Sequence, residues 1–225
     1  MNKIIIILIF VMMQSLFADH DPFESVNLIT HELNQGLDEK FAVPIAKAYS
    51  DITPDPLEKA VSNFVANIED INISANNILQ GKFKSGIGDI ARFLINSTIG
   101  IAGIFDVASG MGLEKHDEDF GQTLAVWGVP EGPYIVLPAL GPSNLRDTLA
   151  RIPDSFLTPL FLITHERTSY ELTMVDMLET RARYLGLESL VIGDEYLFFK
   201  DSYFQNRNFE IYDGVVEDTF EDFED

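Results

Sequence analysis

Apolar residues recur every three or four positions through most of the chain, which is the spacing of an α-helix with one buried face. The clearest case begins at Asp55, an aspartate that can cap a helix. Pro56 follows at the first helical position, and Glu58 is placed to return a hydrogen bond to the cap. The pattern therefore predicts a helix that starts directly after Asp55. Its apolar stripe consists of Leu57, Ala60, Val61, Phe64, Val65 and Ile68.

Two more helices and one extended segment are expected further along. Ser74 can cap a short helix that ends at Gly81, and a later helix is expected at about residues 169–184. Prolines bracket residues 134–137, which can form only a short extended stretch. Because no run of alternating strands and no internal repeat is present, the sequence predicts a mainly α-helical single domain.

The N-terminus has the pattern of an export signal. Lys3 supplies one positive charge, and an unbroken apolar run follows at residues 4–13. As a helix this run spans roughly 15 Å, about half of a hydrocarbon core of ~30 Å, so it is typical of a secretory signal peptide and too short for a membrane span. We expect a signal peptide at 1–18, cleaved after Ala18, and an exported protein. The alternative is that the run is retained as an anchor.

Residues 86–109 differ from the rest because they contain a long uncharged run. Thirteen uncharged residues separate Arg92 from Asp106, and as a helix they would span ~20 Å, which is too short to cross a bilayer. The large apolar side chains fall all round such a helix, so it would be either fully buried or facing lipid. Residues 96–98 and the glycines at 100 and 103 offer a place to turn. A core helix and a segment immersed in one leaflet both stay open.

The charge and the residue composition exclude several classes of function. With 36 acidic and 15 basic residues the net charge is −21, which repels phosphate backbones and excludes nucleic-acid binding as a main function. The absence of cysteine excludes disulfides, thiolate metal sites, cysteine nucleophiles and thioether lipid anchors. Residues 210–225 hold eight acids and no base, which predicts a disordered, solvated tail.

Signatures of catalysis or metal binding are missing. HExxH, GxSxG and SxxK motifs are absent from the sequence. His116 precedes Asp117, Glu118 and Asp119, whose oxygens suit a hard cation, but consecutive side chains point in different directions. We therefore interpret this cluster as a solvated turn and predict no enzyme, no metal and no cofactor.

Several motifs, in order and with matching spacing, resemble the MlaA (VacJ) family. The resemblance covers roughly residues 21–209 and assigns 19–209 to one helical domain. It rests on DPFESVN (21–27), VSNF (61–64), NNILQG (76–81), RFLINSTIG (92–100), GIFDVA (103–108), EDFGQTL (118–124), WGV (127–129), GPYIVLP (132–138), GPSNLRD (141–147), ETRA (179–182) and SYFQ (202–205).

The resemblance implies a helical ring that lies in the inner leaflet of the Gram-negative outer membrane, often beside trimeric porins. A central amphipathic channel would take phospholipids misplaced in the outer leaflet and pass them to a periplasmic lipid-carrier protein of the Mla pathway, which maintains lipid asymmetry without enzymatic chemistry. The membrane-immersed surface would then comprise Phe93, Leu94, Ile99, Ile101, Ile104 and Phe105.

The same resemblance suggests polar residues that are buried or face the channel. The other interpretation of each is a helix cap or a structural ion pair. The residues are Asn96, Asp106, Asp119, Gln122, Arg146 and Asp147.

One feature departs from the family pattern. Its members usually carry a lipobox cysteine, and this chain has no cysteine to acylate. Either inserted helices suffice for attachment or the N-terminal run is retained. Two other functions stay open: a periplasmic scaffold that recruits partners with the acidic tail, and a lipid hydrolase, for which no nucleophile motif is present.

Overall fold

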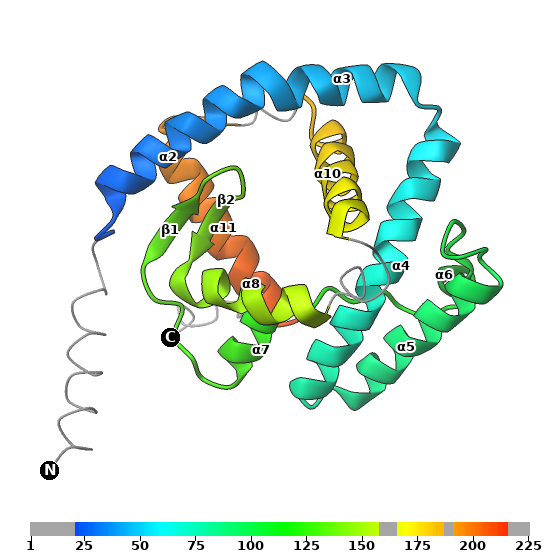
Figure 1. Ribbon diagram of the computed structural model, residues 1–225. Coiled ribbons are helices and arrows are strands. Elements are labelled where there is room, and N and C mark those ends of the chain that lie inside the picture. Colours follow the sequence, from blue (N-terminus) through cyan, green and yellow to red (C-terminus); the bar gives the residue numbers. More distant parts are fainter. Residues whose placement is uncertain (1–20, 158–165, 187–190, 216–225) are drawn as a thin grey trace, which may run out of the picture.

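The computed structural model describes residues 21–157, 166–186 and 191–215 and forms a flat helical ring (Figure 1). The expected signal peptide at 1–18 lies outside the described residues. The elements are α2 (Glu24–Leu37), the π-helical η1 (Asp38–Ala42), α3 (Val43–Ile52), α4 (Asp55–Leu79), α5 (Phe83–Thr98), α6 (Val107–Gly110), α7 (Phe120–Val126), β1 (Tyr134–Leu137), β2 (Gly141–Asn144), α8 (Leu145–Leu157), α10 (Glu166–Arg183) and α11 (Glu195–Ile211).

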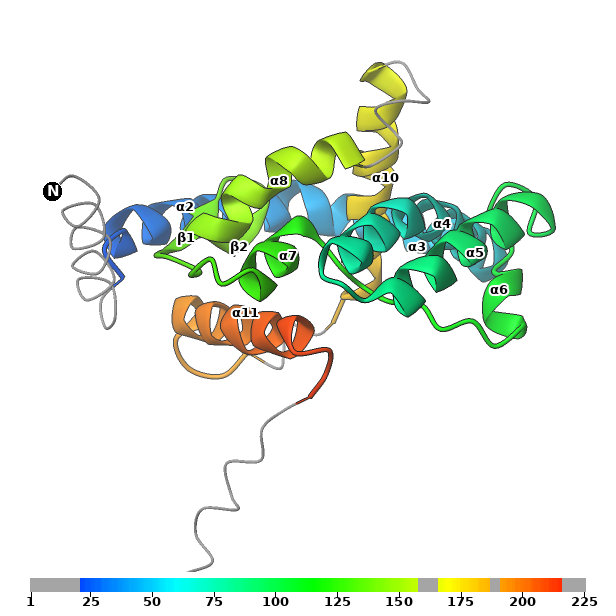
Figure 2. The same ribbon diagram turned by 90° about the horizontal axis from the view of Figure 1, so that it is seen from below.

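The ring is built from consecutive elements laid end to end. α2, η1 and α3 form one arc, α4 and α5 form the next side, and α7, α8 and the β1–β2 hairpin close the circle (Figure 1). Seen edge-on, α11 lies beneath the ring, and α10 crosses it and projects from the opposite side (Figure 2). The mainly helical fold expected from the sequence is confirmed.

The α4–α5 hairpin corrects two predictions about helix ends. The N-cap of α4 is Pro54, without a side-chain cap bond, so Asp55 is already helical and the predicted cap is wrong. Ser74 caps nothing: it is buried within α4, and its hydroxyl donates to the Gly86 carbonyl at 2.8 Å. Gly81, with φ +84°, follows the end of the helix as predicted.

Close approach of α4 and α5 depends on Gly86. A Cβ at this position would lie 2.7 Å from Cγ1 of Ile78 and 3.0 Å from the Ser74 carbonyl oxygen. Any larger residue would therefore separate the two helices and lengthen the Ser74 hydrogen bond.

The extended stretch predicted between the prolines is β1, and its partner β2 was not expected. Tyr134 lies opposite Asn144, and Leu137 lies opposite Gly141. The sequence Gly-Pro-Ser-Asn of β2 has low strand propensity, which explains why it gave no signal. The side-chain amide of Asn27 donates to the Tyr134 carbonyl at 3.0 Å and accepts from the Val136 N–H at 2.9 Å. These two hydrogen bonds attach α2 to the backbone of β1.

The helix predicted at about 169–184 is confirmed as α10, and Gly186 follows it with φ +89°. Its C-terminal end is attached to the outer arc of the ring. Arg181 donates to both carboxylate oxygens of Asp38 in η1, at 2.7 and 2.8 Å. This bidentate pair links α10 to the junction of α2 and α3.

The predicted tail begins later than expected. Glu210 and Ile211 belong to α11, and Glu210 accepts from Arg207 at 3.0 Å. Asp213 forms an ion pair with Lys82 in the turn between α4 and α5. The expectation that residues from 210 onward are solvated and disordered is therefore wrong for the first of them, and residues 216–225 lie outside the described residues.

The burial pattern is the reverse of an ordinary soluble domain. Among the described residues, eight hydrophobic side chains are buried, compared with seventeen polar or charged ones. A small hydrophobic cluster of Tyr134, Val136 and Tyr196, with Tyr203 and Phe204 against it, joins the hairpin to α11. Hydrogen bonds and ion pairs stabilise most of the interior, while many large apolar side chains are exposed.

Candidate functional site

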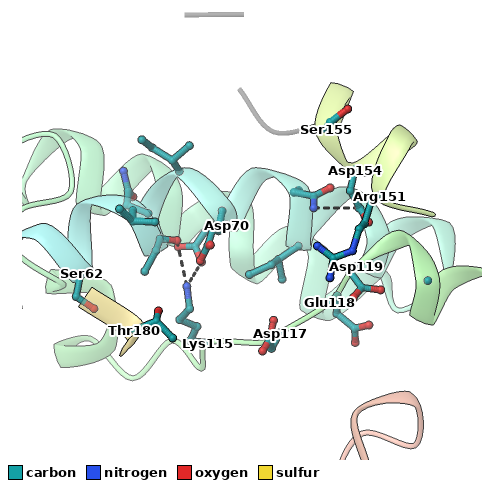
Figure 3. Close-up of a pocket in the computed structure, with 18 of the residues that line it drawn as sticks. Ser62, Asp70, Lys115, Asp117, Glu118, Asp119, Arg151, Asp154, Ser155 and Thr180 are labelled. Carbon is teal, nitrogen blue, oxygen red and sulfur yellow. Dashed lines mark hydrogen bonds and ion pairs between the residues drawn. The ribbon is translucent and has the colours of Figure 1, made fainter. Parts of the chain in front are cut away.

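A polar cavity of about 980 Å³ lies inside the ring, between α4, α5, the 113–119 segment, α8, α10 and α11 (Figure 3). Its lining contains three more carboxylates than cationic groups. The carboxylates are Glu69, Asp70, Asp106, Asp117, Glu118, Asp119, Asp147 and Asp154, and the cations are Arg92, Lys115, Arg151, Arg183 and Arg207.

One wall is organised around Arg92 of α5, which is 2% exposed. Its guanidinium lies 3.6 Å from Asp70 of α4 and 3.2 Å from Asp106, and it donates to the Leu113 carbonyl at 2.6 Å. Lys115 reaches the other oxygen of Asp70 at 3.3 Å. Burial raises the pKa of Asp70 above its ordinary value, although Lys115 and Arg92 act in the opposite direction.

Asp106 joins this wall to α6 as its N-cap. It accepts from the Ser109 N–H at 3.1 Å and from the Asn96 amide at 3.0 Å. Burial alone would raise its pKa, but the hydrogen bonds from Ser109 and Asn96 and the charge of Arg92 lower the pKa to about 2. The carboxylate is therefore ionised at any physiological pH.

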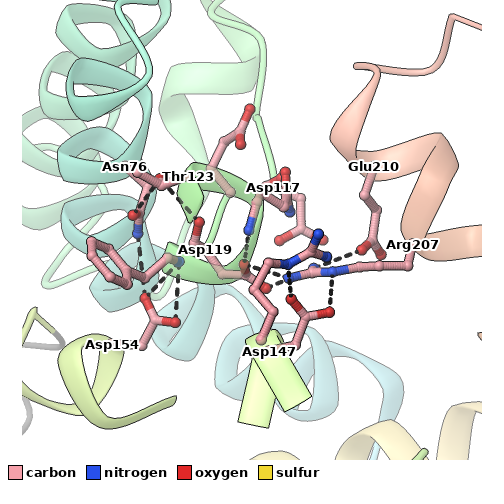
Figure 4. Close-up of polar contacts among 12 residues, drawn as sticks. Asn76, Asp117, Asp119, Thr123, Asp147, Asp154, Arg207 and Glu210 are labelled. Carbon is pink, nitrogen blue, oxygen red and sulfur yellow. Dashed lines mark hydrogen bonds and ion pairs between the residues drawn. The ribbon is translucent and has the colours of Figure 1, made fainter. Parts of the chain in front are cut away.

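The opposite wall is organised around Arg207 of α11 (Figure 4). Its guanidinium donates to both oxygens of Asp119, at 2.7 and 2.8 Å, and to Asp147 at 2.8 Å. Burial would raise the pKa of Asp147, but hydrogen bonds from Arg146, Arg207 and Tyr203 lower it. These contacts join α11 to the N-cap of α7 and to α8. Ion pairs of Arg207 therefore attach α11 to the ring beneath the cavity.

Asp154 of α8 connects a third set of polar groups (Figure 4). It accepts from the Phe120 N–H at 3.0 Å and from the Asn72 amide at 3.1 Å. Thr123 donates to Asn76 at 2.8 Å, and Asn76 in turn lies 3.4 Å from Asp154. Burial is the largest influence on Asp154 and raises its pKa.

The cluster after His116 is not a solvated turn, so that interpretation is wrong. Glu118 is 5% exposed and pairs with Lys82 at 2.8 Å, and His116 Nδ1 lies 2.8 Å from buried Asp89. Asp119 pairs with Arg207, so these three side chains have three different partners, and the described residues contain no group of three such side chains that could hold a metal ion.

The six predicted polar residues divide into two groups. Four of them line the cavity, namely Asn96, Asp106, Asp119 and Asp147. Gln122 and Arg146 are buried beside it: Gln122 donates to the Asp117 carbonyl at 3.1 Å and Arg146 to Asp147 at 2.8 Å. Asp106 and Asp119 are also helix N-caps, so lining and capping are not exclusive roles.

Sequence reasoning missed most of the charged wall. Arg207 pairs with residues 60 and 88 positions away, and no local pattern marks such a partnership. The one available signal was Arg92, a charge placed between the apolar residues of a helix. The site residues that were not predicted include Asp70, Arg92, Lys115, Arg151, Asp154 and Arg207.

A second, apolar cavity of about 920 Å³ lies on the other side of α10. Leu37, Phe41 and Ile45 of the outer arc face Met177 and Leu178 of α10 across it. Thr180 lines both cavities, so α10 separates a polar compartment from an apolar one.

The predicted membrane-facing segment is a turn and not one continuous helix. α5 ends at Thr98, and residues 99–106 fold back with φ +55° at Ile101 and +56° at Ala102. Phe93 is half-buried, whereas the other five predicted residues are 37–64% exposed, which excludes the core-helix interpretation.

Exposed apolar residues continue around the ring with helical spacing. α5 and α8 each present such a stripe, with intervals of four, three and four residues. No helix in the described parts of the chain has the length and hydropathy to cross a bilayer. The stripes are Phe83, Ile87, Ile90 and Leu94 on α5 and Leu145, Leu149, Ile152 and Phe156 on α8.

Comparison with known proteins gives a consistent result. The sequence model of the family described as MlaA lipoprotein matches residues 19–210. The Escherichia coli intermembrane phospholipid transport system lipoprotein MlaA is 33% identical over 196 residues, which covers 84% of this chain and 77% of that protein. The protein of the same name from Haemophilus influenzae is 26% identical, covering 92% of this chain and 85% of that protein.

An uncharacterized protein of Rickettsia typhi is 38% identical over 169 residues, and the match spans 75% of this chain and 66% of that relative. A solved structure described as "Structural basis for maintenance of bacterial outer membrane lipid asymmetry" superposes with a TM-score of 0.78 at 31% identity. The superposition covers 85% of this chain and 99% of that one.

Proposed function

The chain belongs to the MlaA lipoprotein family, and from this premise we propose that it transports phospholipids at the bacterial outer membrane. It removes phospholipids misplaced in the outer leaflet and passes them to a periplasmic carrier, which maintains lipid asymmetry. The E. coli and H. influenzae relatives, named as components of an intermembrane phospholipid transport system, support this proposal.

The observation that carries the proposal is the reversed burial of the ring. Exposed apolar stripes lie outside and a charged cavity lies inside. Contiguous apolar surface of this extent on a soluble monomer would promote aggregation, whereas acyl chains would cover it. Burying one such side chain contributes ~1.5–3 kcal/mol, so several together hold the ring in a leaflet.

We assign the immersed surface to the turn after α5 and to the outward stripes. The turn residues include Ile99, Ile101 and Phe105, each more than half exposed. In this proposal the ring lies in one leaflet, the inner one, facing the periplasm, with its apolar stripes against acyl chains. This arrangement allows attachment without an acylated cysteine.

The two cavities suit the two parts of a phospholipid. The polar cavity receives the head group and the apolar cavity receives acyl chains, with Thr180 of α10 at their boundary. Transfer needs no nucleophile, and lipid asymmetry or the downstream pathway supplies the free energy. A neighbouring trimeric porin would contact the outer face of the ring.

The full chain, purified in detergent, tests the proposal. We expect it to float with phosphatidylethanolamine vesicles and to transfer labelled phospholipid to acceptor vesicles. Trp127 is the one tryptophan of the chain and is 54% exposed, so its emission should shift to shorter wavelength on binding.

A bacterial strain that lacks the chain distinguishes transport from scaffolding. Phospholipid should accumulate in its outer leaflet, and the full chain should reverse this. If the protein binds vesicles but neither carries lipid nor clears it, the scaffold function replaces transport. Phospholipid cleavage by the purified protein would establish a hydrolase.

A further inference from the structure

Among the described residues that line the polar cavity, one cation is not neutralised. Arg92 and Arg207 pair with carboxylates at 2.7–3.6 Å, and Lys115 lies 3.3 Å from Asp70. Arg151 of α8 lines the same cavity and is exposed to it, yet it forms no hydrogen bond or ion pair with any described residue. A guanidinium without a partner in a cavity is available to a ligand.

The surroundings of Arg151 carry negative charge. In Figure 3 its side chain lies toward the same end of the cavity as Asp119 and Asp154, while Lys115 and Asp70 lie toward the other end. Asp117, in the segment between α6 and α7, also lines the cavity, and its carboxylate has no partner among the described residues. Within the part of the chain that the structure describes, Arg151 and Asp117 therefore supply an available cation and an available carboxylate to a cavity whose lining has an excess of carboxylates.

The wall also contains polar atoms with unused hydrogen-bonding capacity. Oδ1 of Asn67, on a side chain that is 4% exposed, has no hydrogen-bond partner in the described structure. Oδ2 of Asp70 and Nε of Arg92 also make no hydrogen bond, but they face each other as an ion pair at 3.6 Å. Buried polar atoms are normally satisfied, so water or a polar guest is expected beside Asn67.

We propose that this cavity selects zwitterionic phospholipid head groups, with Arg151 receiving the phosphodiester and Asp117 receiving the ammonium group. A guanidinium donates two parallel N–H groups to phosphate oxygens. An ammonium group offsets the phosphate charge and pairs with carboxylate, whereas a glycerol head group brings one net negative charge and no cation to the acidic lining. The inference rests on the proposed transport function and specifies its substrate class.

The test measures which lipids stay bound to the full chain. The protein is reconstituted in vesicles of equal phosphatidylethanolamine and phosphatidylglycerol, extracted in mild detergent, and its bound lipids are quantified by mass spectrometry. We expect about 3- to 10-fold enrichment of phosphatidylethanolamine over the vesicle ratio. Bound lipid in the vesicle ratio overturns the selectivity and leaves transport standing, whereas no bound lipid at all contradicts transport itself.

Two variants separate the two roles. Arg151→Gln should lower the occupancy of both lipids by about 3- to 10-fold, because it removes the phosphate partner. Asp117→Asn should keep the occupancy but reduce the enrichment of phosphatidylethanolamine by about threefold. Unchanged occupancy in Arg151→Gln, or unchanged enrichment in Asp117→Asn, overturns the corresponding assignment.

Matched controls are Lys59→Gln and Glu114→Gln. Both residues are exposed, carry the same charges, and lie outside the cavity lining, so neither variant should alter bound lipid. Because all four residues are exposed, melting temperatures should agree with the parent. Glycerophosphoethanolamine, the head group without acyl chains, should bind far more weakly than the lipid, and equal binding would show that a free phosphodiester is the ligand.

Discussion

The two faces of α5 differ in what stabilises them. The outward face presents apolar residues that are 43–65% exposed. The inward face presents Asp89, Arg92 and Asn96, all buried and all bonded to other elements. The outward face therefore depends on the surrounding medium, while the inward face depends on the rest of the fold. Substitutions on the first should alter membrane affinity, and substitutions on the second should alter stability.

The largest effect is expected from Arg92→Ala. Removing the buried guanidinium takes from Asp70 and Asp106 the cation that they share and leaves Asp70 with Lys115 alone, which should lower the free energy of unfolding by about 3–5 kcal/mol. Chemical unfolding in detergent measures this. Lys84→Ala, on the same helix but exposed, is the control, and equal stability of the two variants would contradict the structural role of the inner face.

The double variant Ile101→Glu/Ile104→Glu addresses the outer face. Two carboxylates on the exposed turn should weaken vesicle association by about 2–3 kcal/mol, or roughly 30- to 150-fold, while the melting temperature stays unchanged. Flotation measures the association. Ile192→Glu alters an even more exposed isoleucine that precedes α11 beneath the ring, so its association should match the parent. If the double variant still floats as the parent does, the immersed surface lies elsewhere.

Arg207→Gln sharpens the comparison within the cavity wall. Side-chain exposure of Asp119 is 40%, so water can replace part of the lost ion pair, and we expect local opening of α11 with a loss of about 1–2 kcal/mol. Hydrogen exchange should show faster exchange in α11 and unchanged protection in α5. Equal loss of protection in both helices would mean that α11 is part of one cooperative unit with the ring.

The smallest effects concern pH. The pKa of Asp106 is lowered to about 2, so its contribution to stability is present above about pH 4 and is lost as the pH falls toward 2. The pKa of Asp154 is raised in the folded state. The folded state therefore loses stability as the pH rises from the ordinary pKa of an aspartate through this raised pKa.

Comparing two variants over pH tests these signs. The deficit of Asp106→Asn relative to the parent should shrink between pH 4 and 2. The stability of Asp154→Asn relative to the parent should rise between pH 4 and 7. Both changes should stay within about 1 kcal/mol because solvent screens these groups. Parallel pH profiles for parent and variants would contradict the assignment.

Local signals predicted those features that need only neighbours in the chain. The position of α10, the end of α4 just before Gly81 and the extended β1 all follow from periodicity, glycine and proline. The predicted helix caps were wrong. The local sequence around a serine is similar whether its hydroxyl caps a helix or, like that of Ser74, donates to the backbone of another helix. Arg207 was missed because its partners are far away in sequence.

The sequence by itself determined that the chain is helical, that its helices have an apolar and a polar face, and that residues 93–105 lack charge. Only the tertiary structure decided which face points inward. Helical periodicity distinguishes an apolar face from a polar one but does not determine which face is buried. An apolar stripe has the same spacing whether it packs in a core or contacts lipid. The closed ring resolves this choice: it places Arg92 and Arg207 around one cavity and leaves the apolar stripes outside.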